Sequence, residues 1–358
     1  MRLSELSIHR VRALSQVDIK PAAGLNTIVG PNGSGKSSCL ESIYMLGLGR
    51  SFRSRSVREL ITFGENDLLV RGQVVDSQEQ SYALGIERSR QHTRIRVNGE
   101  DVKAASELAR HLPLLLITPE SQRLLTDGTR LRRRMLDWAL FHVEPQYFPV
   151  YQRYKQALRQ RNAGLRQAMS LASMSPWDAE LEHAAETLHS LRERYVDEVK
   201  TVLKRILQSL MGHPLDLVYH PGWKADQPLG EAMSTRYETD CHRGYTSVGP
   251  HRADLKFLVD GIAAQNVLSR GESKLFVAAV LLAQTAHVIE QHAAVPVVLI
   301  DDMASELDEE NRAKLLRVIR EVGAQTFLTA VTGDALPEAD WDAQKMFHVE
   351  RGLLHEMV

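Results

Sequence analysis

Residues 30–37 read Gly-Pro-Asn-Gly-Ser-Gly-Lys-Ser and fit the pattern GxxxxGK[ST]. A short apolar run, Leu25–Val29, precedes them, and a stretch with helical spacing of apolar residues follows. Glycines let the backbone turn so that successive N–H groups point inward at phosphate oxygens, and the start of the helix adds a positive dipole end. The stretch therefore predicts a strand, a phosphate-binding loop and a helix.

Two side chains of this loop carry the predicted nucleotide chemistry. Lys36 places a point charge near the β and γ phosphates of a nucleoside triphosphate, and the Ser37 hydroxyl is a ligand for Mg²⁺. The alternative is a glycine turn with a chance lysine, which the strand before and the helix after disfavour.

A second predicted strand, Val297–Ile300, ends in the acidic pair Asp301 and Asp302. A buried parallel strand delivers such acids to the phosphate edge of a sheet. Asp301 would hold Mg²⁺, and Asp302 would orient or deprotonate the attacking water. Two acids after a strand are often only a turn or a helix start, but the phosphate loop in the same chain favours the functional interpretation.

A serine and a glycine also open a predicted apolar helix, in the segment Leu268-Ser269-Arg270-Gly271-Glu272. A hydroxyl, backbone N–H groups and a helix dipole at one point suit an anion. Ser269 and Glu272 also fit the capping pattern S-x-x-E, and both interpretations hold together. The later segment Ser-Glu-Leu-Asp308 is by itself only another acidic helix start.

The order of predicted elements favours an α/β protein with an inserted helical part. Strand patterns up to residue 119 include three runs in 68–98 that predict an antiparallel piece with a turn at Asn98-Gly99. Residues 120–245 are mainly helical and predict two antiparallel helices of about six turns each, with a break at Ser-Met-Ser-Pro-Trp, residues 173–177. Residues 246–358 return to α/β alternation. We expect one head formed by 1–119 and 246–358, and an arm formed by 120–245.

Composition excludes several classes of protein. The longest unbroken apolar run has nine residues, whereas a membrane-spanning helix needs about 20. The two cysteines, Cys39 and Cys241, have no CxxC partner, so no disulfide framework is indicated and a cytoplasmic location is expected. The net charge is −1, from 44 basic and 45 acidic residues, so any affinity for nucleic acid must come from local clusters.

Three arginine-rich stretches are candidates for phosphate contacts. Between 120 and 170 there are ten basic and four acidic residues, and four arginines each lie in 50–58 and 88–96. Arginine can contact phosphates with two hydrogen bonds, and such binding weakens steeply with salt. The alternative is an ordinary solvated helix face whose charges pair with the acidic helix 177–200. The candidate DNA contacts are Arg53, Arg55, Arg132, Arg133 and Arg134.

The loop, the LSxG segment, the acidic strand and Ser-Glu-Leu-Asp, in that order, resemble the ATP-binding-cassette class of ATPases. Further strings resemble the RecF family of bacterial recombination mediator ATPases, over nearly the whole chain. These strings are LESIYMLGLGRSFRSRSV at 40–57, ITPE at 117–120, RRRMLDWALFHVEP at 132–145, RYKQALRQRNAGLR at 153–166 and GPHRADL at 249–255.

The resemblance implies a P-loop head of the ABC type and assigns site residues by position. Mg²⁺ would lie at Ser37 and Asp301, water at Asp302, and the γ phosphate would meet Ser269 and Gly271 of a second copy, with Asp308 at the dimer seam. The implied ATP contacts are Gly30, Pro31, Asn32, Gly33, Ser34, Gly35, Lys36, Ser37 and Ser38.

The resemblance also implies an ATP-dependent homodimer on DNA at gaps or junctions that acts with RecR and RecO in loading RecA, and in the SOS response. Three departures from transporter cassettes predict slow hydrolysis, and we expect this hydrolysis to depend on DNA. Asp302 replaces glutamate, Arg270-Gly271-Glu272 replaces Gly-Gly-Gln, and no histidine occurs between His292 and His348. The alternative function is a nucleotide-gated structural clamp or partner scaffold with incidental hydrolysis.

Overall fold

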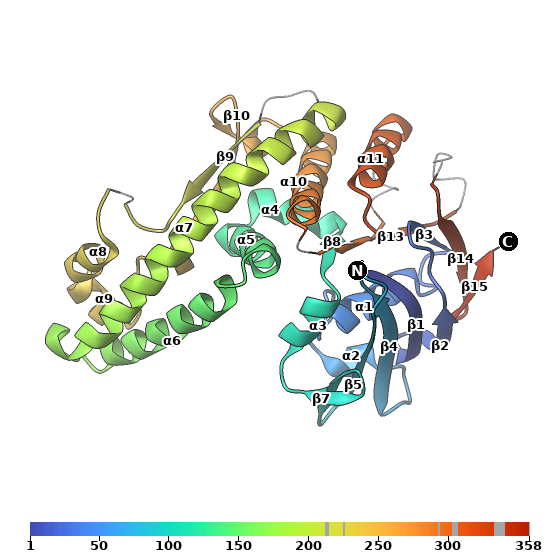
Figure 1. The fold of residues 1–358 in the computed structure, drawn as a ribbon, viewed down its shortest axis with the longest axis horizontal. Coiled ribbons are helices and arrows are strands. Elements are labelled where there is room, and N and C mark those ends of the chain that lie inside the picture. The colour runs from blue at the N-terminus through green and yellow to red at the C-terminus, as the bar shows by residue number, and fades with distance from the viewer. Residues whose placement is uncertain (212–214, 225, 293, 303–306, 333–340, 358) are drawn as a thin grey trace. The chain divides into compact units, whose positions relative to one another are not determined.

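The computed structural model describes residues 1–358 except 212–214, 225, 293, 303–306, 333–340 and 358. The chain divides into two compact units, which are described separately (Figure 1). Unit 1 comprises Met1–Ser121, Ser209–Met211 and Arg270–Val358, and unit 2 comprises Gln122–Gln208 and Gly212–Ser269. The domain boundaries at 119 and 245 stay predictions.

The first sheet of unit 1 is mostly parallel and has the order β15-β14-β3-β13-β12-β8. Its three central strands are buried along their whole length, as the unbroken apolar runs of the sequence predict for parallel strands. Only β15 runs antiparallel to its neighbour. The strands are β3 Leu25–Val29, β8 Leu114–Ile117, β12 Val297–Ile300, β13 Thr326–Ala330, β14 Gln344–Glu350 and β15 Leu353–Met357.

The second sheet of unit 1 is antiparallel and has the order β2-β1-β4-β5-β6-β7. It contains the three strands predicted in 68–98. Asn98 and Gly99 both have positive φ angles, +49° and +85°, as a tight turn between β6 and β7 requires. The strands are β1 Arg2–Val11, β2 Leu14–Ile19, β4 Asp67–Val75, β5 Ser81–Ser89, β6 Thr93–Val97 and β7 Glu100–Val102.

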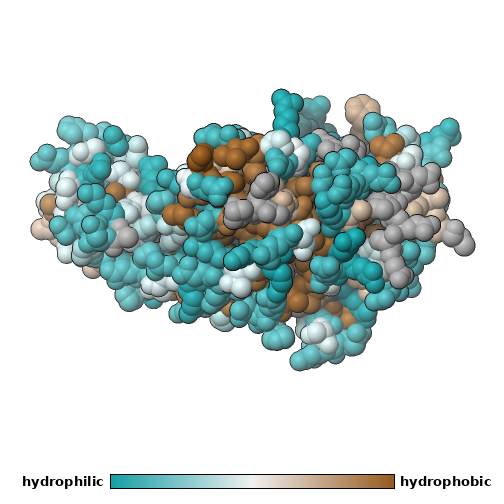
Figure 2. Space-filling view, turned by 90° about the horizontal axis from the view of Figure 1, so that it is seen from above, coloured by the Kyte–Doolittle hydropathy of each residue, from teal (hydrophilic) through white to brown (hydrophobic). Residues whose placement is uncertain are grey.

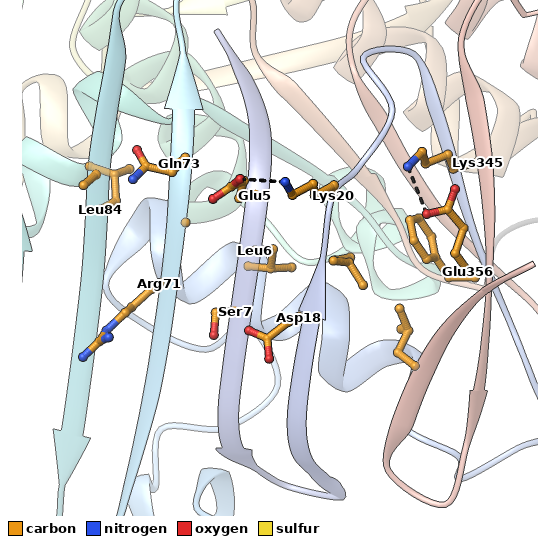
Figure 3. Close-up of a pocket in the computed structure, with 15 residues that line it drawn as sticks. Glu5, Leu6, Ser7, Asp18, Lys20, Arg71, Gln73, Leu84, Lys345 and Glu356 are labelled. Atoms are coloured by element: carbon orange, nitrogen blue, oxygen red, sulfur yellow. Dashed lines mark hydrogen bonds and ion pairs between the residues drawn. The ribbon is translucent and has the colours of Figure 1, made fainter.

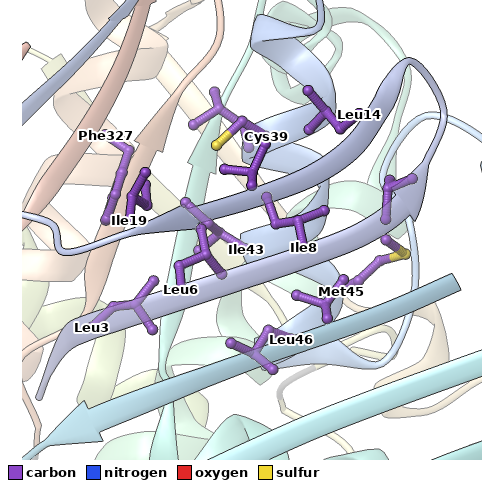
Figure 4. Packing of buried hydrophobic residues seen from close by; sticks show 14 of the residues in the cluster. Leu3, Leu6, Ile8, Leu14, Ile19, Cys39, Ile43, Met45, Leu46 and Phe327 are labelled. Atoms are coloured by element: carbon purple, nitrogen blue, oxygen red, sulfur yellow. The ribbon is translucent and has the colours of Figure 1, made fainter. Parts of the chain in front are cut away.

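The hydrophobic core of unit 1 lies around helix α1, Lys36–Leu48, which packs between the two sheets (Figure 4). Ile43 of this helix is buried together with Leu6 of β1 and Phe327 of β13. The helix that follows the phosphate loop is therefore fixed on both sides. The other helices of unit 1 are α2 Val57–Leu60, α3 Ala105–His111, α10 Arg270–Glu290 and α11 Glu309–Val322, and the 3-10 turn η1, Pro119–Gln122, lies at its border.

Helix α10 is long and apolar enough, by length and composition, to cross a membrane. In the structure, 78% of its most apolar window is buried, and the helix packs against β8 and α11. These features are typical of the core helix of a globular unit.

Unit 2 is mainly helical, with a small antiparallel sheet of order β11-β10-β9. On the face seen in Figure 2, hydrophilic residues predominate at the left end, where α8 and α9 lie in Figure 1. Its elements are α4 Arg123–Thr126, α5 Thr129–Val143, α6 Tyr147–Arg166, α7 Leu171–Leu210, α8 Leu229–Thr235, α9 Tyr237–Arg243, β9 Leu215–His220, β10 Asp254–Val259, β11 Ile262–Ala263, η2 Pro250–Arg252 and η3 Ala264–Asn266.

The predicted break at residues 173–177 is wrong, because Pro176 lies inside α7. The chain turns instead at 167–170, where Ala168 has a φ of +51° and the Ser170 hydroxyl accepts a hydrogen bond from the N–H of Ser173 at 3.3 Å. Pro176 is the sixth residue of α7 and lacks one backbone N–H donor, and the buried apolar positions from Met174 onward keep the helix continuous through it. The second helix is consequently 40 residues long, about 60 Å, rather than six turns.

Candidate functional site

The segment between β3 and α1 forms a tight loop whose glycines are required by geometry. Gly30, Gly33 and Gly35 have φ angles of +156°, +79° and +120°, in the range that favours glycine. A Cβ atom at Gly30 would lie 2.4 Å from the carbonyl oxygen of Val349, and one at Gly35 would lie 2.8 Å from a methyl group of Leu14. The loop is therefore a fixed turn with no room for side chains at two of its positions.

Polar groups of the loop are gathered around this turn. Lys36 is 8% exposed, and its Nζ donates to the carbonyl oxygens of Gly30 at 2.7 Å and Pro31 at 3.1 Å. The Ser34 hydroxyl is buried and has no hydrogen-bond partner within the described part of the chain. A buried orphan hydroxyl beside a lysine and a glycine turn fits an anionic ligand with several acceptor oxygens.

The acidic end of β12 meets the loop because β12, β13 and β3 are adjacent parallel strands. The Ser37 hydroxyl donates to Oδ1 of Asp301 at 2.9 Å, across 264 positions of sequence. The Asp301 N–H donates to the carbonyl oxygen of Ile117 on β8, which holds the acid at the sheet edge. A serine hydroxyl and a carboxylate side by side are the oxygen ligands that Mg²⁺ takes in nucleotide sites.

A third residue, Thr329 of β13, orients both acids and has no counterpart in the sequence prediction. Its hydroxyl donates to Oδ1 of Asp301 at 2.9 Å and accepts from the N–H of Asp302 at 2.9 Å. Asp302 itself has a φ of +52°, a left-handed conformation that aspartate tolerates better than most residues. Thr329 therefore fixes the position of Asp301 relative to Asp302.

The LSxG segment lies at the start of α10. This helix begins at Arg270, directly after Ser269, and a Cβ atom at Gly271 would meet nothing within 4 Å. Asp308 caps α11, since its carboxylate accepts from the N–H of Asn311 at 2.8 Å. The first two residues of the Ser-Glu-Leu-Asp segment, 305 and 306, lie outside the described residues. Contacts of this segment with a second copy stay a prediction.

Two of the candidate DNA contacts are engaged within unit 2. Arg132 forms an ion pair with Asp254 at 2.8 Å and donates to the carbonyl oxygen of Leu124, and Arg133 donates to the carbonyl oxygen of Ala253. A phosphate contact by either arginine would compete with these bonds.

Of the other three candidates, Arg134 is exposed on α5, and Arg53 and Arg55 are exposed on a loop that is tied to α1. The Ser51 hydroxyl accepts from the N–H groups of Arg53 and Ser54 at 2.9 Å each and donates to the buried carboxylate of Glu41. Glu41 also binds Arg12, and this hydrogen bonding raises the pKa of the arginine. The arginine loop is therefore anchored to the same helix that begins at the phosphate loop.

A hollow of about 640 Å³ lies elsewhere, lined by β1, β2, β4 and β5 of the antiparallel sheet and by β14 and β15 of the mostly parallel sheet (Figure 3). Two ion pairs lie at its rim. Nζ of Lys20 is 3.4 Å from Oε1 of Glu5, and Nζ of Lys345 is 3.0 Å from Oε2 of Glu356. None of the predicted site residues lines it. Its basic and acidic groups neutralise each other, so it carries no argument for a nucleotide.

Comparisons with known proteins agree with this geometry. The family model described as "RecF/RecN/SMC N terminal domain" matches residues 2–355. A protein of Vibrio campbellii described as "DNA replication and repair protein RecF" is 40% identical over 354 residues, which cover 98% of this chain and 99% of the relative. A protein of Stutzerimonas stutzeri with the same description is 41% identical over 363 residues, which cover 100% of this chain and 98% of the relative.

Solved structures show the same fold. The structure described as the "recombination mediator protein RecF-ATP in RecFOR pathway" has a TM-score of 0.87 at 24% identity, covering 99% of this chain and 97% of that chain. A structure of an SmcHead bound to the C-winged helix domain of ScpA has a TM-score of 0.62 at 15% identity, covering 100% of this chain and 97% of that chain. The prediction of an α/β head of the ABC ATPase type with an inserted helical arm is confirmed.

Proposed function

Because this chain belongs to the RecF family of DNA replication and repair proteins, we propose that it is a slow, DNA-dependent ATPase that closes as a homodimer on DNA. The relatives are described by their role in replication and repair, and a solved relative is described as RecF-ATP. The observation that carries the proposal is the convergence of Ser37, Asp301 and Thr329 beside the glycine turn.

The loop residues would hold the triphosphate of ATP. Residues Gly30 to Ser38 would contact the phosphates through backbone N–H groups and the Ser34 hydroxyl, and Lys36 would exchange its two carbonyl partners for phosphate oxygens. Ser37 and Asp301 would hold Mg²⁺, which supplies charge neutralisation between the β and γ phosphates when bound. The loop accounts for the recognition of the phosphates.

Hydrolysis would need both copies of the chain. Asp302 orients the attacking water, and Thr329 positions Asp302 through its N–H. Ser269 and Gly271 of the partner would contact the γ phosphate, and Asp308 would lie at the seam. Asp302 is one methylene shorter than the glutamate of transporter cassettes, so we expect slow hydrolysis that releases the two subunits after ATP has joined them.

DNA would meet the exposed arginines Arg53 and Arg55. Because Ser51 and Glu41 tie their loop to α1, a contact there is coupled to the nucleotide site through one helix. We place the protein in the cytoplasm, at gaps or junctions, where it would act with RecR and RecO to load RecA and take part in the SOS response.

Titration of ATP in the presence of Mg²⁺ tests the proposal. We expect Lys36→Ala to abolish ATP binding and DNA-stimulated phosphate release, and Lys20→Ala, a lysine away from the loop, to leave both unchanged. Equal ATP affinity of the two variants contradicts the assignment of the site. Undiminished function of an Asp302→Asn dimer that no longer hydrolyses ATP favours the structural clamp instead.

A further inference from the structure

Helix α6 of unit 2 has an unbalanced charge. Its 20 residues include five basic side chains and no aspartate or glutamate. Two of the five are neutralised by acids of α7 or α9: Arg161 is buried against Asp178 and Asp240, and Arg153 pairs with Glu180. The remaining three are exposed and have no carboxylate within ion-pair distance in the described part of the chain: Lys155, Arg159 and Arg166.

These three cations lie on one stripe of the helix. Tyr151, Lys155, Arg159, Asn162 and Arg166 follow each other at intervals of four, four, three and four residues, which places them on the same face. Fifteen residues separate the ends of the stripe, so it is about 22 Å long. The ammonium group of Lys155 lies 5.5 Å from the ring centroid of Tyr151, which restrains the side chain on that face.

Residues 241–253, which comprise the last residues of α9 and the chain that follows it, extend the stripe. The Thr246 N–H donates to Oδ1 of Asn162 at 2.8 Å, which sets this segment against the middle of the stripe. Residues 241–253 contain no acid, and Arg243 and Arg252 are exposed there. Arg252 lies 5.2 Å from the ring centroid of Tyr245, itself 40% exposed.

Buried hydrogen bonds hold the stripe and the segment as one surface. Arg161 is fully buried and donates to Thr246 Oγ1 at 2.8 Å, and the Tyr154 hydroxyl lies 2.6 Å from Nδ1 of His251. Both bonds join α6 to residues 241–253. A charged surface on a fixed backbone needs little ordering when it binds, which favours affinity.

We propose that Lys155, Arg159, Arg166, Arg243 and Arg252 form a second contact surface for the phosphate backbone of duplex DNA, named here the α6 surface. The proposal rests on the proposed function, because it assumes that the protein binds DNA through Arg53 and Arg55 as well. The length of about 22 Å corresponds to about six base pairs. Only one exposed aromatic, Tyr245, accompanies the five cations, whereas single-strand binding uses rows of aromatic residues for stacking.

The salt dependence of duplex binding tests the α6 surface. In the full-length protein with ATP and Mg²⁺, we expect the triple variant Lys155→Gln, Arg159→Gln, Arg166→Gln to lower the slope of log affinity against log salt by about 0.9 per lost contact, up to about 2.7. At 0.1 M salt this corresponds to about eightfold weaker binding per contact. Arg153→Gln is the matched control, since its side chain is exposed on the same helix but paired with Glu180.

The outcomes separate this inference from the proposed function. An unchanged slope in the triple variant, with a reduced slope in Arg53→Gln, Arg55→Gln, overturns the α6 surface and leaves the proposed function intact. No duplex binding by the unmodified protein overturns both. Loss of binding to a single-stranded oligonucleotide alone also overturns the duplex assignment. If the triple variant does not fold, Arg159→Gln and Arg243→Gln carry the same test one contact at a time.

Discussion

Replacing Thr329 by valine removes the two hydrogen bonds that orient the acidic pair and leaves the other residues of the site in place. The valine keeps the shape of a β-branched side chain in β13 but removes the hydroxyl that donates to Asp301 and accepts from the Asp302 N–H. Thr329 is 1% exposed, so water does not replace the lost partner without a change in packing. Asp301 keeps its bond from Ser37, whereas the Asp302 N–H loses the Thr329 hydroxyl as an acceptor.

The magnitude follows from these two bonds. The loss of a part-buried hydrogen bond of this kind costs about 0.5–1.5 kcal/mol of folding free energy. Removal of a group that orients a metal-binding carboxylate typically costs about 10–100-fold in metal affinity or activity. We therefore expect Thr329→Val to lower the free energy of unfolding by that amount and to raise the Mg²⁺ concentration needed for half-maximal ATP hydrolysis about 10–100-fold.

A second threonine on the same strand provides the control. Thr326 is 0% exposed, and its hydroxyl donates to the carbonyl oxygen of Ala324 at 3.0 Å, away from both acids. Thr326→Val should reduce stability in urea unfolding but leave the Mg²⁺ dependence of single-turnover phosphate release unchanged. If both valine variants need the same Mg²⁺ concentration as the unmodified protein, Thr329 has only a packing role and the reasoning fails.

Three further predictions concern stability, pH and the loop. Asp137→Ala should lower the free energy of unfolding in urea by about 3–5 kcal/mol, because it leaves the 2% exposed guanidinium of Arg192 without its acid; a loss below 1 kcal/mol contradicts this. Burial lowers the pKa of His251 from 6.5 to about 4, so between these pH values the unfolded chain binds the extra proton and stability rises with pH by about 1.4 kcal/mol per unit. His251→Asn should flatten the pH profile of the melting temperature in that window, and an unaltered profile refutes the assignment. Gly30→Ala should weaken ATP binding about tenfold or more in calorimetry, because its Cβ would lie 2.4 Å from the Val349 carbonyl oxygen. Such an overlap costs about 1–3 kcal/mol in the loop conformation. Unchanged affinity shows that the loop is not rigid.

Local chemistry explains why half of the site could be predicted from sequence. The glycine turn, Lys36 and Ser37 are contiguous, so their pattern alone specifies the loop. The meeting of Ser37 with Asp301 follows from a general rule, since parallel strands carry their carboxyl ends to one edge of a sheet. Both predictions needed no knowledge of the order of the strands.

The role of Thr329 depends on strand order and could not be predicted. Thr326 and Thr329 are both threonines in one buried strand, and no periodicity distinguishes them. Only the arrangement of β13 between β3 and β12 brings Thr329 to the acidic pair. Strand β8, Leu114–Ile117, was not predicted either, because its four residues are too short a pattern to separate from the helical sequence nearby.

Packing overrode a local signal in the arm. Pro176 favours a break on its own, yet Ser170 starts the helix earlier and the apolar positions from Met174 onward are buried. The arginine cluster shows the same effect. Arg132 and Arg133 stand beside Arg134 in the sequence, and no local pattern distinguishes the three. Only the fold shows that Asp254 engages Arg132 and that the Ala253 carbonyl group engages Arg133.

The proposal that two copies of the chain bind ATP between them is tested most directly by sedimentation. The experiment uses the full-length chain with a non-hydrolysable ATP analogue, Mg²⁺ and a short duplex. We expect a dimer with the analogue, a monomer without it, and a monomer for Lys36→Ala under both conditions. A chain that binds the analogue with the affinity of an ATP site and yet remains monomeric with duplex present contradicts the account.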